Sequence, residues 1–401
     1  MQATLASADR ASGAGYPTRS AGALVIGGAH GSLAVVRSLG RKGVPVHLLT
    51  DDHPIAKYSR YVTRSASWPG PNDPGALDYL LNLGLDGWVL FPGGDAEAQF
   101  ISKNHEQLSR VFRVTTPPWE VVRWAVDKRL TYDLAAELGI DHPWSCYPQN
   151  REEVAGLQCR FPLILKPTVR QHANAFTAAK AWRVDDRAEL LARYDQAVAL
   201  AGKDGLVIQE MIPGNGAAQF SYAAVWNDDR PIASLVARRA RQYPITFGYT
   251  STFVESIDLP EIEDAAARFL RAIHYRGLVE IEFKYDARED RYKILDVNAR
   301  TWTWNALGQR AGVDFPHILW RMAMGESMLP VRGRAGVAWM HASRDVVAAV
   351  QEMCAGTLSP LAYFKSLCAP MTFAAFALDD PVPGLIDFPL TIRRSLRRPR
   401  L

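Results

Sequence analysis

Acidic, amide and basic side chains alternate along two neighbouring segments of the chain. In the first segment Glu280 and Glu282 are two residues apart, and in the second Asp296, Asn298 and Arg300 follow the same spacing. Because successive side chains of a β-strand point to opposite faces, each set shares one face if these segments are strands. The spacing therefore predicts a polar face built from two strands.

A hairpin through residues 286–291 would lay Glu282 against Asp296 and Asn298. Two carboxylates and an amide oxygen make a hard-oxygen site suited to Mg²⁺, with Mn²⁺ as an alternative ion. Arg300, one step further along, has the planar fork that binds a phosphate or an acyl phosphate. The alternative interpretation is a solvated strand face with cross-strand ion pairs.

Three upstream features favour a nucleotide site. Lys166 ends the apolar strand 161–167, so its stem is buried and its ammonium points to a cleft. Lys128 follows Asp127 at the head of a helix. Residues 207–214 form an apolar strand broken by Pro-Gly, a hinge whose backbone groups can pair with an adenine edge. Each feature alone is also compatible with a structural role.

The elements before this region alternate between strand and helix. Short apolar strands are predicted at 23–26, 46–49 and 88–91, and Asp95 is placed to cap a helix that runs to about Leu108. Strand, helix and strand in this rhythm predict a parallel sheet covered by helices. We expect a Rossmann-like α/β domain over residues 22–115.

A glycine-rich turn, Gly27 to Ser32, follows the first strand of that domain. It departs from the dinucleotide-binding pattern GxGxxG because Ala29 replaces the second glycine. We interpret it as a tight turn that helps to bind a substrate, with dinucleotide binding as the alternative. His30 within it has no triad or metal context in the sequence.

Residues 116–330 are predicted to form an α+β domain with long antiparallel strands, divided at residue 214 into an N-terminal lobe (116–214) and a C-terminal lobe (215–330). Residues 1–21 are expected to be a disordered N-terminus, and 331–401 a C-terminal extension with a basic tail. Predicted strands lie at 161–167, 206–211, 232–242, 278–285 and 292–297, and predicted helices at 187–201, 262–273 and about 345–354.

Composition excludes several classes of protein. The 401 residues are 48% hydrophobic and 22% charged, as in globular proteins, and the longest apolar run is too short for a membrane span. Five arginines lie between Arg393 and Arg400, and without them 41 basic residues face 42 acidic ones. The body is therefore near neutral, so we expect neither nucleic acid nor membrane as a partner. Four scattered cysteines indicate reduced thiols and a cytoplasmic protein.

The order of the motifs resembles the ATP-grasp superfamily over about residues 115–325. The motifs are Asp-Lys, Phe-Pro-x-x-x-Lys-Pro, Gln-Glu-x-Ile-Pro-Gly, Glu-x-Glu-Phe and Asp-x-Asn-x-Arg. Within the superfamily the chain looks most like predicted carboxylate–amine ligases related to D-aspartate ligase. Arg-Gln-Tyr-Pro-x-x-Phe-Gly at 241–248 and Asp-Asp-Pro-x-Pro at 379–383 also resemble that group. The resemblance implies an ATP-grasp fold preceded by a Rossmann-like domain.

The resemblance also implies roles for individual residues. Phosphates would be bound by Lys128 and Lys166, and Arg300 would stabilise the transferred phosphoryl group. The adenine would be lined by Gln209, Glu210, Met211 and Ile212, and Mg²⁺ held by Glu282, Asp296 and Asn298. Asp296 stands where the family usually has Glu, and the flap segment 168–176 has no glycine.

Arg239 and Arg241 are predicted to share one face of the strand 232–242, with Arg238 on the other. Such a pair can bind a substrate carboxylate, so we count both with Lys166 and Arg300 as candidate catalytic residues. The alternative is a solvated strand edge. Trp302 and Trp304 either wall a substrate pocket or belong to the core.

The implied reaction is phosphoryl transfer from ATP to a carboxylate, giving ADP and an acyl phosphate that an amine then attacks. The expected partners are a small carboxylic or amino acid and an amine, and such ligases are commonly dimers, so a homodimer is one expected assembly. An ATP-grasp carboxylase or kinase-like enzyme, a non-catalytic nucleotide-binding protein and a nicotinamide dehydrogenase are the alternatives.

Overall fold

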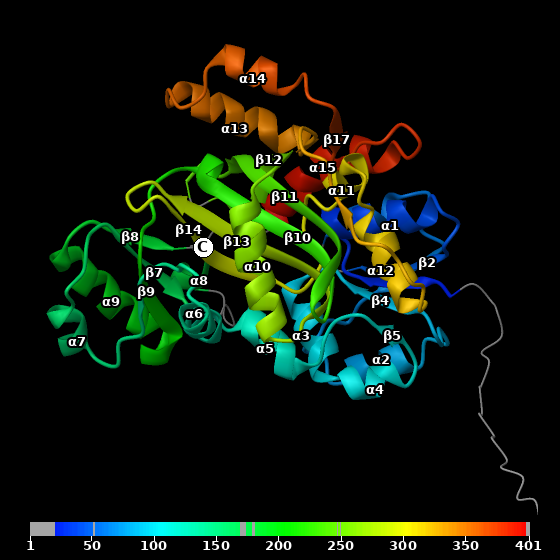
Figure 1. Ribbon diagram of the computed structural model, residues 1–401, viewed down its shortest axis with the longest axis horizontal. Helices are drawn as coiled ribbons and strands as arrows, with labels where there is room; N and C mark the ends of the chain where they lie inside the picture. The colour runs from blue at the N-terminus through cyan, green and yellow to red at the C-terminus, as the bar shows by residue number, and fades with distance from the viewer. Residues whose placement is uncertain are drawn as a thin grey trace, which may run out of the picture.

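The computed structural model describes residues 21–50, 53–168, 174–178, 181–246, 248 and 250–397. Of the predicted terminal segments, residues 1–20 and the side chains from residue 392 onward lie outside this part. Within the described ranges the strands form three sheets, of five, four and eight strands. Figure 1 shows the five-stranded and four-stranded sheets at opposite ends of the molecule, with the largest sheet between them.

The five-stranded sheet is parallel, with the strand order β3-β2-β1-β4-β5. The two central strands, β1 and β4, are apolar throughout and fully buried, as is typical of a parallel sheet covered on both faces. This confirms the predicted parallel α/β fold of the first part of the chain. Its elements are β1 (Ala23–Ile26), α1 (His30–Gly40), β2 (Val46–Thr50), η1 (Ile55–Tyr58), β3 (Arg64–Ser67), α2 (Ala76–Leu81), β4 (Val89–Pro92), α3 (Asp95–Lys103), α4 (His105–Ser109) and β5 (Arg113–Val114).

The four-stranded sheet is antiparallel, in the order β6-β9-β7-β8, and α9 packs on it through Leu190, Tyr194 and Ala197. Two helices, α5 (Trp119–Val126) and α6 (Lys128–Glu137), precede it. The remaining elements of this lobe are β6 (Ser145–Cys146), α7 (Arg151–Gly156), β7 (Leu163–Pro167), α8 (Ala175–Ala178), β8 (Trp182–Val184), α9 (Arg187–Ala201), η2 (Lys203–Gly205) and β9 (Leu206–Glu210).

The largest sheet has the path β14-β13-β10-β11-β12-β16-β17, and β15 pairs with β11. Between residues 216 and 298 the chain forms η3 (Gly216–Ala218), β10 (Gln219–Asn227), β11 (Arg230–Tyr243), β12 (Thr250–Ile257), α10 (Pro260–Ala272), β13 (Arg276–Asp286) and β14 (Arg291–Asn298). The elements that follow are α11 (Ala306–Ala311), α12 (Phe315–Ala323), β15 (Val331–Arg332), β16 (Ala338–Met340), α13 (Ala342–Cys354), α14 (Pro360–Ser366), β17 (Met371–Phe373) and α15 (Val382–Arg397).

Both faces of this sheet are buried, and β10 shows how. Ala223 and Val225 face the core shared with α1 and the first domain, whereas Tyr222 and Ala224 face the core formed with α5, α6 and α10. Trp302 and Trp304 belong to the first of these cores and are almost fully buried, so they pack the interior rather than wall a pocket. The sheet is therefore fixed to the first domain on one side and to α5 and α6 on the other.

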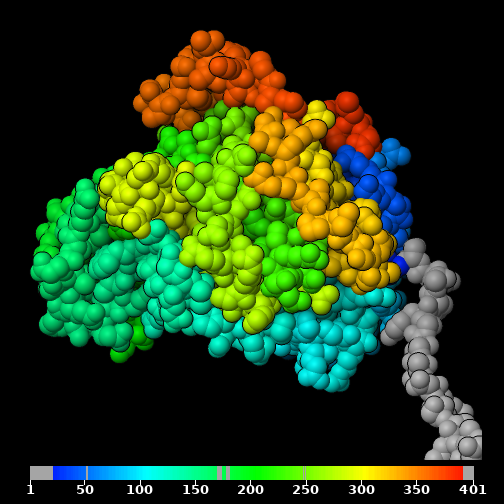
Figure 2. Space-filling view, in the orientation of Figure 1, coloured from blue at the N-terminus to red at the C-terminus, as the bar shows by residue number. Residues whose placement is uncertain are grey.

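The strands after residue 330 join the same sheet, so the expected extension 331–401 is continuous with the C-terminal lobe. Figure 2 shows α13 and α14, in orange, projecting from the body at the top of the view. The Asp-Asp-Pro motif docks this region on the first domain, because Asp380 binds Arg37 and Asp379 binds Arg41. Among the helices that the structure describes, none combines the length and apolar character needed to cross a bilayer.

Candidate active site

The predicted hairpin is formed by β13 and β14 and brings the acidic residues together. Strands β13 and β14 pair in antiparallel register, with Glu282 opposite Asp296 and Glu280 opposite Asn298. The side chain of Asp296 is 42% exposed and that of Glu282 is 20% exposed. The pairing places two carboxylates side by side at a partly open surface, as the alternation of the sequence predicts.

Two cations neutralise these carboxylates. The ammonium of Lys128 lies 2.8 Å from Oδ1 of Asp296, and the guanidinium of Arg239 donates to Oε1 of Glu282 at 3.3 Å. Lys128 begins α6, whose N-terminus is capped by Asp127. Like charges placed side by side repel, so the carboxylates need such partners or a bound cation. In this structure each of the two carboxylates is thus paired with one cationic side chain.

The pKa values of Lys128 and Asp296 move in the directions expected of an ion pair. Burial lowers the pKa of Lys128, but the charges of Asp296, Tyr132 and Glu282 together hold it above its ordinary value. Burial raises the pKa of Asp296, but Lys128, Arg300 and Lys166 together hold it below its ordinary value. Both groups therefore stay charged at neutral pH.

Glu280 lies deeper and orients Asn298. Its carboxylate accepts from Nδ2 of Asn298 at 3.2 Å and from Nε1 of Trp304 at 3.0 Å. Burial, assisted by the charge of Glu282, raises the pKa of Glu280 to about 7. With its amide nitrogen bound in this way, Asn298 turns Oδ1 toward Arg300, which donates to it at 3.0 Å. Glu280 thus acts as a positioning residue for Asn298.

Arg300 also connects the hairpin to the first domain. Its Nε donates to Oδ1 of Asp95 at 2.7 Å, and its Nη2 lies 3.3 Å from Oδ2. Asp95 is the first residue of α3, and the expectation that it caps a helix to Leu108 is wrong. Gly94 is the N-cap, and the helix ends at Lys103. The carboxylate binds Arg300 instead of a backbone N–H, so sequence analysis missed Asp95 as a site residue.

Lys166 and Gln209 meet on the opposite lobe. The ammonium of Lys166 donates to Oε1 of Gln209 at 2.7 Å, and Nε2 of Gln209 donates to Tyr132 at 3.2 Å and to Ser145 at 2.9 Å. Tyr132 in turn donates to the carbonyl of Leu295 at 3.1 Å. Tyr132 and Ser145, which were not predicted, link the lysine of β7 to the strand that carries Asp296.

The hinge residues 210–212 lie between the lobes. The side chain of Glu210 binds Lys293 at 2.7 Å and Arg288 at 3.0 Å. Met211 donates its N–H to Pro162 O at 3.1 Å, and Ile212 is buried. The carboxylates around Glu210 already enclose the ammonium of Lys293. The cluster of Glu210, Asp286 and Glu289 is thus an ion-pair network centred on Lys293.

Arg239 and Arg241 do not converge on one site. A register irregularity separates them on β11, and Arg241 lies between the rings of Phe253 and Tyr363. Its guanidinium forms a bidentate ion pair with the fully buried Asp345 of α13, at 2.9 and 2.8 Å. The expected carboxylate-binding pair is therefore corrected: Arg239 contacts Glu282 of the acidic site, and Arg241 fastens α13 to the sheet.

The flap predicted at 168–176 falls largely outside the described residues, which omit 169–173. The glycine turn after β1 is described. A Cβ at Gly31 would lie 2.9 Å from the carbonyl oxygen of Trp302, so glycine permits close packing of α1 against the segment that follows Arg300. This packing accounts for a glycine there without a bound phosphate.

Comparisons with known proteins bear on the fold. Residues 239–330 match the family described as the carbamoyl-phosphate synthase L chain, ATP binding domain. D-aspartate ligase of Enterococcus faecium is 23% identical over 261 residues, which span 61% of this chain and 62% of that protein. The chain thus matches less than two thirds of the length of this relative.

Solved structures that share this fold match a larger part of the chain. An L-amino acid ligase from Bacillus licheniformis has a TM-score of 0.57 at 16% identity, covering 76% of this chain and 75% of its own. The biotin carboxylase domain of Hydrogenobacter thermophilus 2-oxoglutarate carboxylase, solved with MgADP and bicarbonate, has a TM-score of 0.61 at 14% identity, covering 79% and 73%. The predicted ATP-grasp fold, preceded by a Rossmann-like domain, and the predicted resemblance are confirmed.

Proposed function

We propose that this chain, which has the ATP-grasp fold, is an ATP-dependent carboxylate–amine ligase that acts through an acyl phosphate. The observation that carries the proposal is the pairing of Glu282 with Asp296 beside Lys128, with Arg300 two residues beyond Asn298. Oxygen ligands, an ammonium and a planar guanidinium within one face are the groups that phosphoryl transfer requires.

The residues present fit a magnesium–nucleotide complex. Glu282, Asp296 and Asn298 offer the oxygen donors that Mg²⁺ prefers, and the first two lie at a partly open surface where phosphate oxygens can complete the coordination. When bound, Mg²⁺ supplies charge neutralisation at the phosphates. Lys128, which now pairs with Asp296, is free to turn to a phosphate once a cation takes over that carboxylate.

The remaining residues bind and orient the two substrates. Lys128 and Lys166 neutralise the phosphates, and the backbone at 210–212 with Gln209 lines the adenine. Arg300 stabilises the transferred phosphoryl group, and Asp95 holds its guanidinium in one orientation. Positioning and electrostatic stabilisation provide most of the catalysis in such transfers.

The reaction has two steps. One oxygen of the substrate carboxylate attacks the γ-phosphorus, the bond to the β-phosphate oxygen breaks, and ADP leaves. The amine then attacks the acyl carbon and expels inorganic phosphate, which retains that carboxylate oxygen, while the proton of the amine passes to phosphate or water. D-aspartate ligase and L-amino acid ligase among the relatives favour a small amino or carboxylic acid as substrate.

The second candidate is a carboxylase or kinase-like reaction in which no amide forms, and the fold shared with a bicarbonate-binding biotin carboxylase favours it. Dependence on an amine separates the two. The test incubates the purified protein with ATP, Mg²⁺ and a pool of small carboxylic acids and N-acetylated amino acids, with and without a second pool of amines and free amino acids, and measures ADP and AMP.

The controls are Lys166→Ala and the exposed first-domain variant Lys42→Ala. ADP that requires both pools, is lost in Lys166→Ala and persists in Lys42→Ala supports the ligase. ADP release without an amine requirement supports the second candidate. AMP, or no nucleotide product with any pool, contradicts the proposal.

A further inference from the structure

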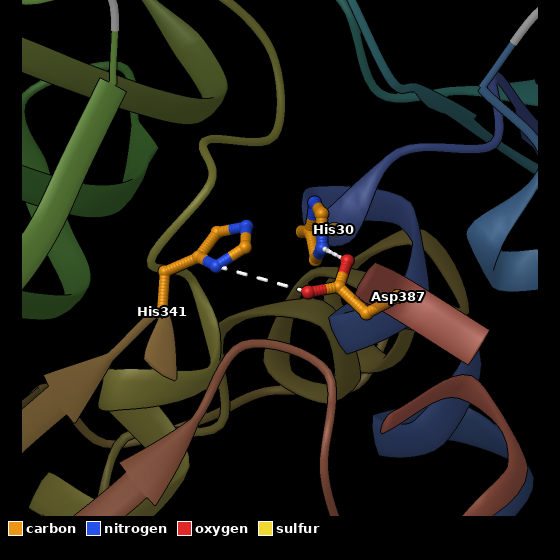
Figure 3. A group of neighbouring side chains, drawn as sticks. All are labelled: His30, His341 and Asp387. Atoms are coloured by element: carbon orange, nitrogen blue, oxygen red, sulfur yellow. Dashed lines mark hydrogen bonds and ion pairs between the residues drawn. The ribbon is translucent and has the colours of Figure 1, made fainter. Parts of the chain in front are cut away.

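Three buried side chains from distant parts of the chain meet beside the first domain. His30 is the first residue of α1, His341 precedes α13, and Asp387 lies in α15; they are 4%, 1% and 5% exposed. Each offers one ligand-type atom within 4.8 Å of those of the other two, and Figure 3 shows the side chains turned toward one another. The chemistry proposed for the hairpin site uses none of them.

The hydrogen bonds within this cluster leave Nε2 of His341 without a partner among the described residues. Nε2 of His30 lies 2.8 Å from Oδ1 of Asp387, and the hydroxyl of Ser343 donates to Oδ2 at 2.9 Å. Because that hydroxyl proton is used, the Ser343 oxygen accepts from Nδ1 of His341, 3.3 Å away. This tautomer puts a lone pair on Nε2 of His341, a buried atom with no hydrogen-bond partner among the described residues.

A buried polar atom without a partner costs free energy, so it points to a missing ligand. Donor hydrogens or a metal ion can satisfy an imidazole lone pair. We propose that His30, His341 and Asp387 bind one divalent transition metal ion of the Zn²⁺ class. Two imidazoles and one carboxylate suit such an ion, whereas Mg²⁺ and Ca²⁺ prefer oxygen ligands alone.

The surroundings fit a metal centre. Ser343 bridges a histidine and the carboxylate, which is the kind of outer hydrogen bond that orients metal ligands. Zinc ligands lie about 2.0–2.2 Å from the ion, so two ligand atoms of a tetrahedral site are roughly 3.3 Å apart. The three ligand atoms here lie within 4.8 Å of one another, so binding an ion requires these side chains to shift by about 1 Å. To bind the ion through Nε2, the neutral His30 ring carries its proton on Nδ1, so that Nε2 presents a lone pair to the ion. The ion would join α1 of the first domain to α15.

A neighbouring pair offers a matched control. The guanidinium of Arg37 binds the buried Asp380 at 2.9 Å and so joins α1 to the segment before α15, as the proposed metal would, but without any imidazole. Asp380→Asn weakens the same docking and leaves the three ligands in place. A loss of metal caused only by loosened packing would appear in this variant too.

The experiment uses the full-length protein, stripped with a chelator and then dialysed against Zn²⁺ or Co²⁺. Metal content is measured by elemental analysis, and the Co²⁺ form by its visible absorption. We expect one equivalent in the wild type and in Asp380→Asn, and at least a tenfold weaker affinity in His341→Ala and Asp387→Asn. Zn²⁺ should also raise the Tm of the wild type but not of the ligand variants.

His341→Cys keeps a metal ligand at this position and guards against unfolding of the alanine variant. It should retain Co²⁺ and add a thiolate-to-cobalt absorption band. The proposal fails if the wild type binds no stoichiometric Zn²⁺ or Co²⁺, or if His341→Ala and Asp387→Asn bind as much as the wild type. None of these measurements involves ATP, so their outcome is independent of the proposed ligase activity.

Discussion

Arg300 at the end of β14 and Asp95 at the start of α3 form a two-point ion pair, with Nε of Arg300 donating to Oδ1 of Asp95 at 2.7 Å. The pair connects the candidate phosphoryl-binding arginine to the first domain, 205 residues earlier in the chain. The orientation of the guanidinium is thereby set from outside its own hairpin.

This ion pair predicts different effects on activity and stability. Arg300→Ala should lower kcat by about 10²–10³-fold, as removal of a transition-state donor does. Asp95→Asn should lower kcat about tenfold through lost orientation. Because the side chain of Asp95 is 62% exposed, Asp95→Asn should cost no more than about 1 kcal/mol of unfolding free energy, whereas Arg300→Ala also removes the donor to the buried Asn298 and should cost about 1–3 kcal/mol. Steady-state kinetics and urea unfolding measure both, and a stability loss with unchanged kcat would refute the assignment.

The Glu282–Asp296 pair predicts an altered magnesium requirement. Asp296→Asn removes one charged oxygen ligand, so the Mg²⁺ concentration for half-maximal activity should rise at least tenfold. Asp290→Asn, in the turn of the same hairpin where Asp290 accepts from Tyr285, is the matched control and should leave this concentration unchanged. A titration of activity against Mg²⁺ provides the measurement. Equal requirements in wild type and Asp296→Asn would exclude Asp296 as a ligand.

Arg241 predicts a stability effect, because its partner is fully buried. Arg241→Ala leaves the carboxylate of Asp345 unpaired in the interior, which typically costs about 3–5 kcal/mol. Arg238→Ala, three positions earlier and paired with the partly exposed Glu255, should cost about 0–1 kcal/mol. Urea unfolding followed by tryptophan fluorescence distinguishes the two. Similar losses in both variants would mean that Arg241 does not fasten α13.

Glu280 predicts a pH dependence of stability. Its pKa is about 7 in the folded chain against an ordinary value of 4.5. Between about pH 4.5 and about pH 7 the folded state keeps a proton that the unfolded state has lost, so this group makes unfolding easier as pH rises. Glu280→Gln, which does not titrate, should lack that decline and gain stability relative to the wild type as pH rises.

The measurement is the unfolding free energy of both proteins at about pH 5 and about pH 8. The difference between variant and wild type should shift in favour of the variant at the higher pH. A difference that is the same at both values would show that Glu280 is ionised throughout this range in the folded chain.

The sequence alone predicted the features that depend only on the order of residues within one segment. Alternation along the hairpin predicted that Glu282 faces Asp296, and the apolar run ending in Lys166 predicted a strand. It was insufficient where long-range contacts decide. Asp95 resembles a helix cap, and only its contact with Arg300 reveals its role. Tyr132 resembles an ordinary helical residue, although it contacts the strand that carries Asp296.

Two central strands also escaped prediction, for a physical reason. Strands β10 and β12 are buried on both faces, so their side chains do not alternate between apolar and polar residues. The irregularity on β11 between Arg239 and Arg241 leaves no mark in the sequence either, and it separates two arginines that strict alternation would place together. Register and sheet position depend on neighbouring strands, which a single segment does not encode.

The acyl phosphate is tested most directly by following oxygen. The accepted carboxylic acid, labelled with ¹⁸O in its carboxylate, is incubated with ATP, Mg²⁺ and the amine, and the phosphorus products are examined by ³¹P NMR. The account predicts one ¹⁸O atom in each inorganic phosphate released, together with unlabelled ADP, and loss of this product in Arg300→Ala. Label in AMP, or amide formed without label in phosphate, would contradict it.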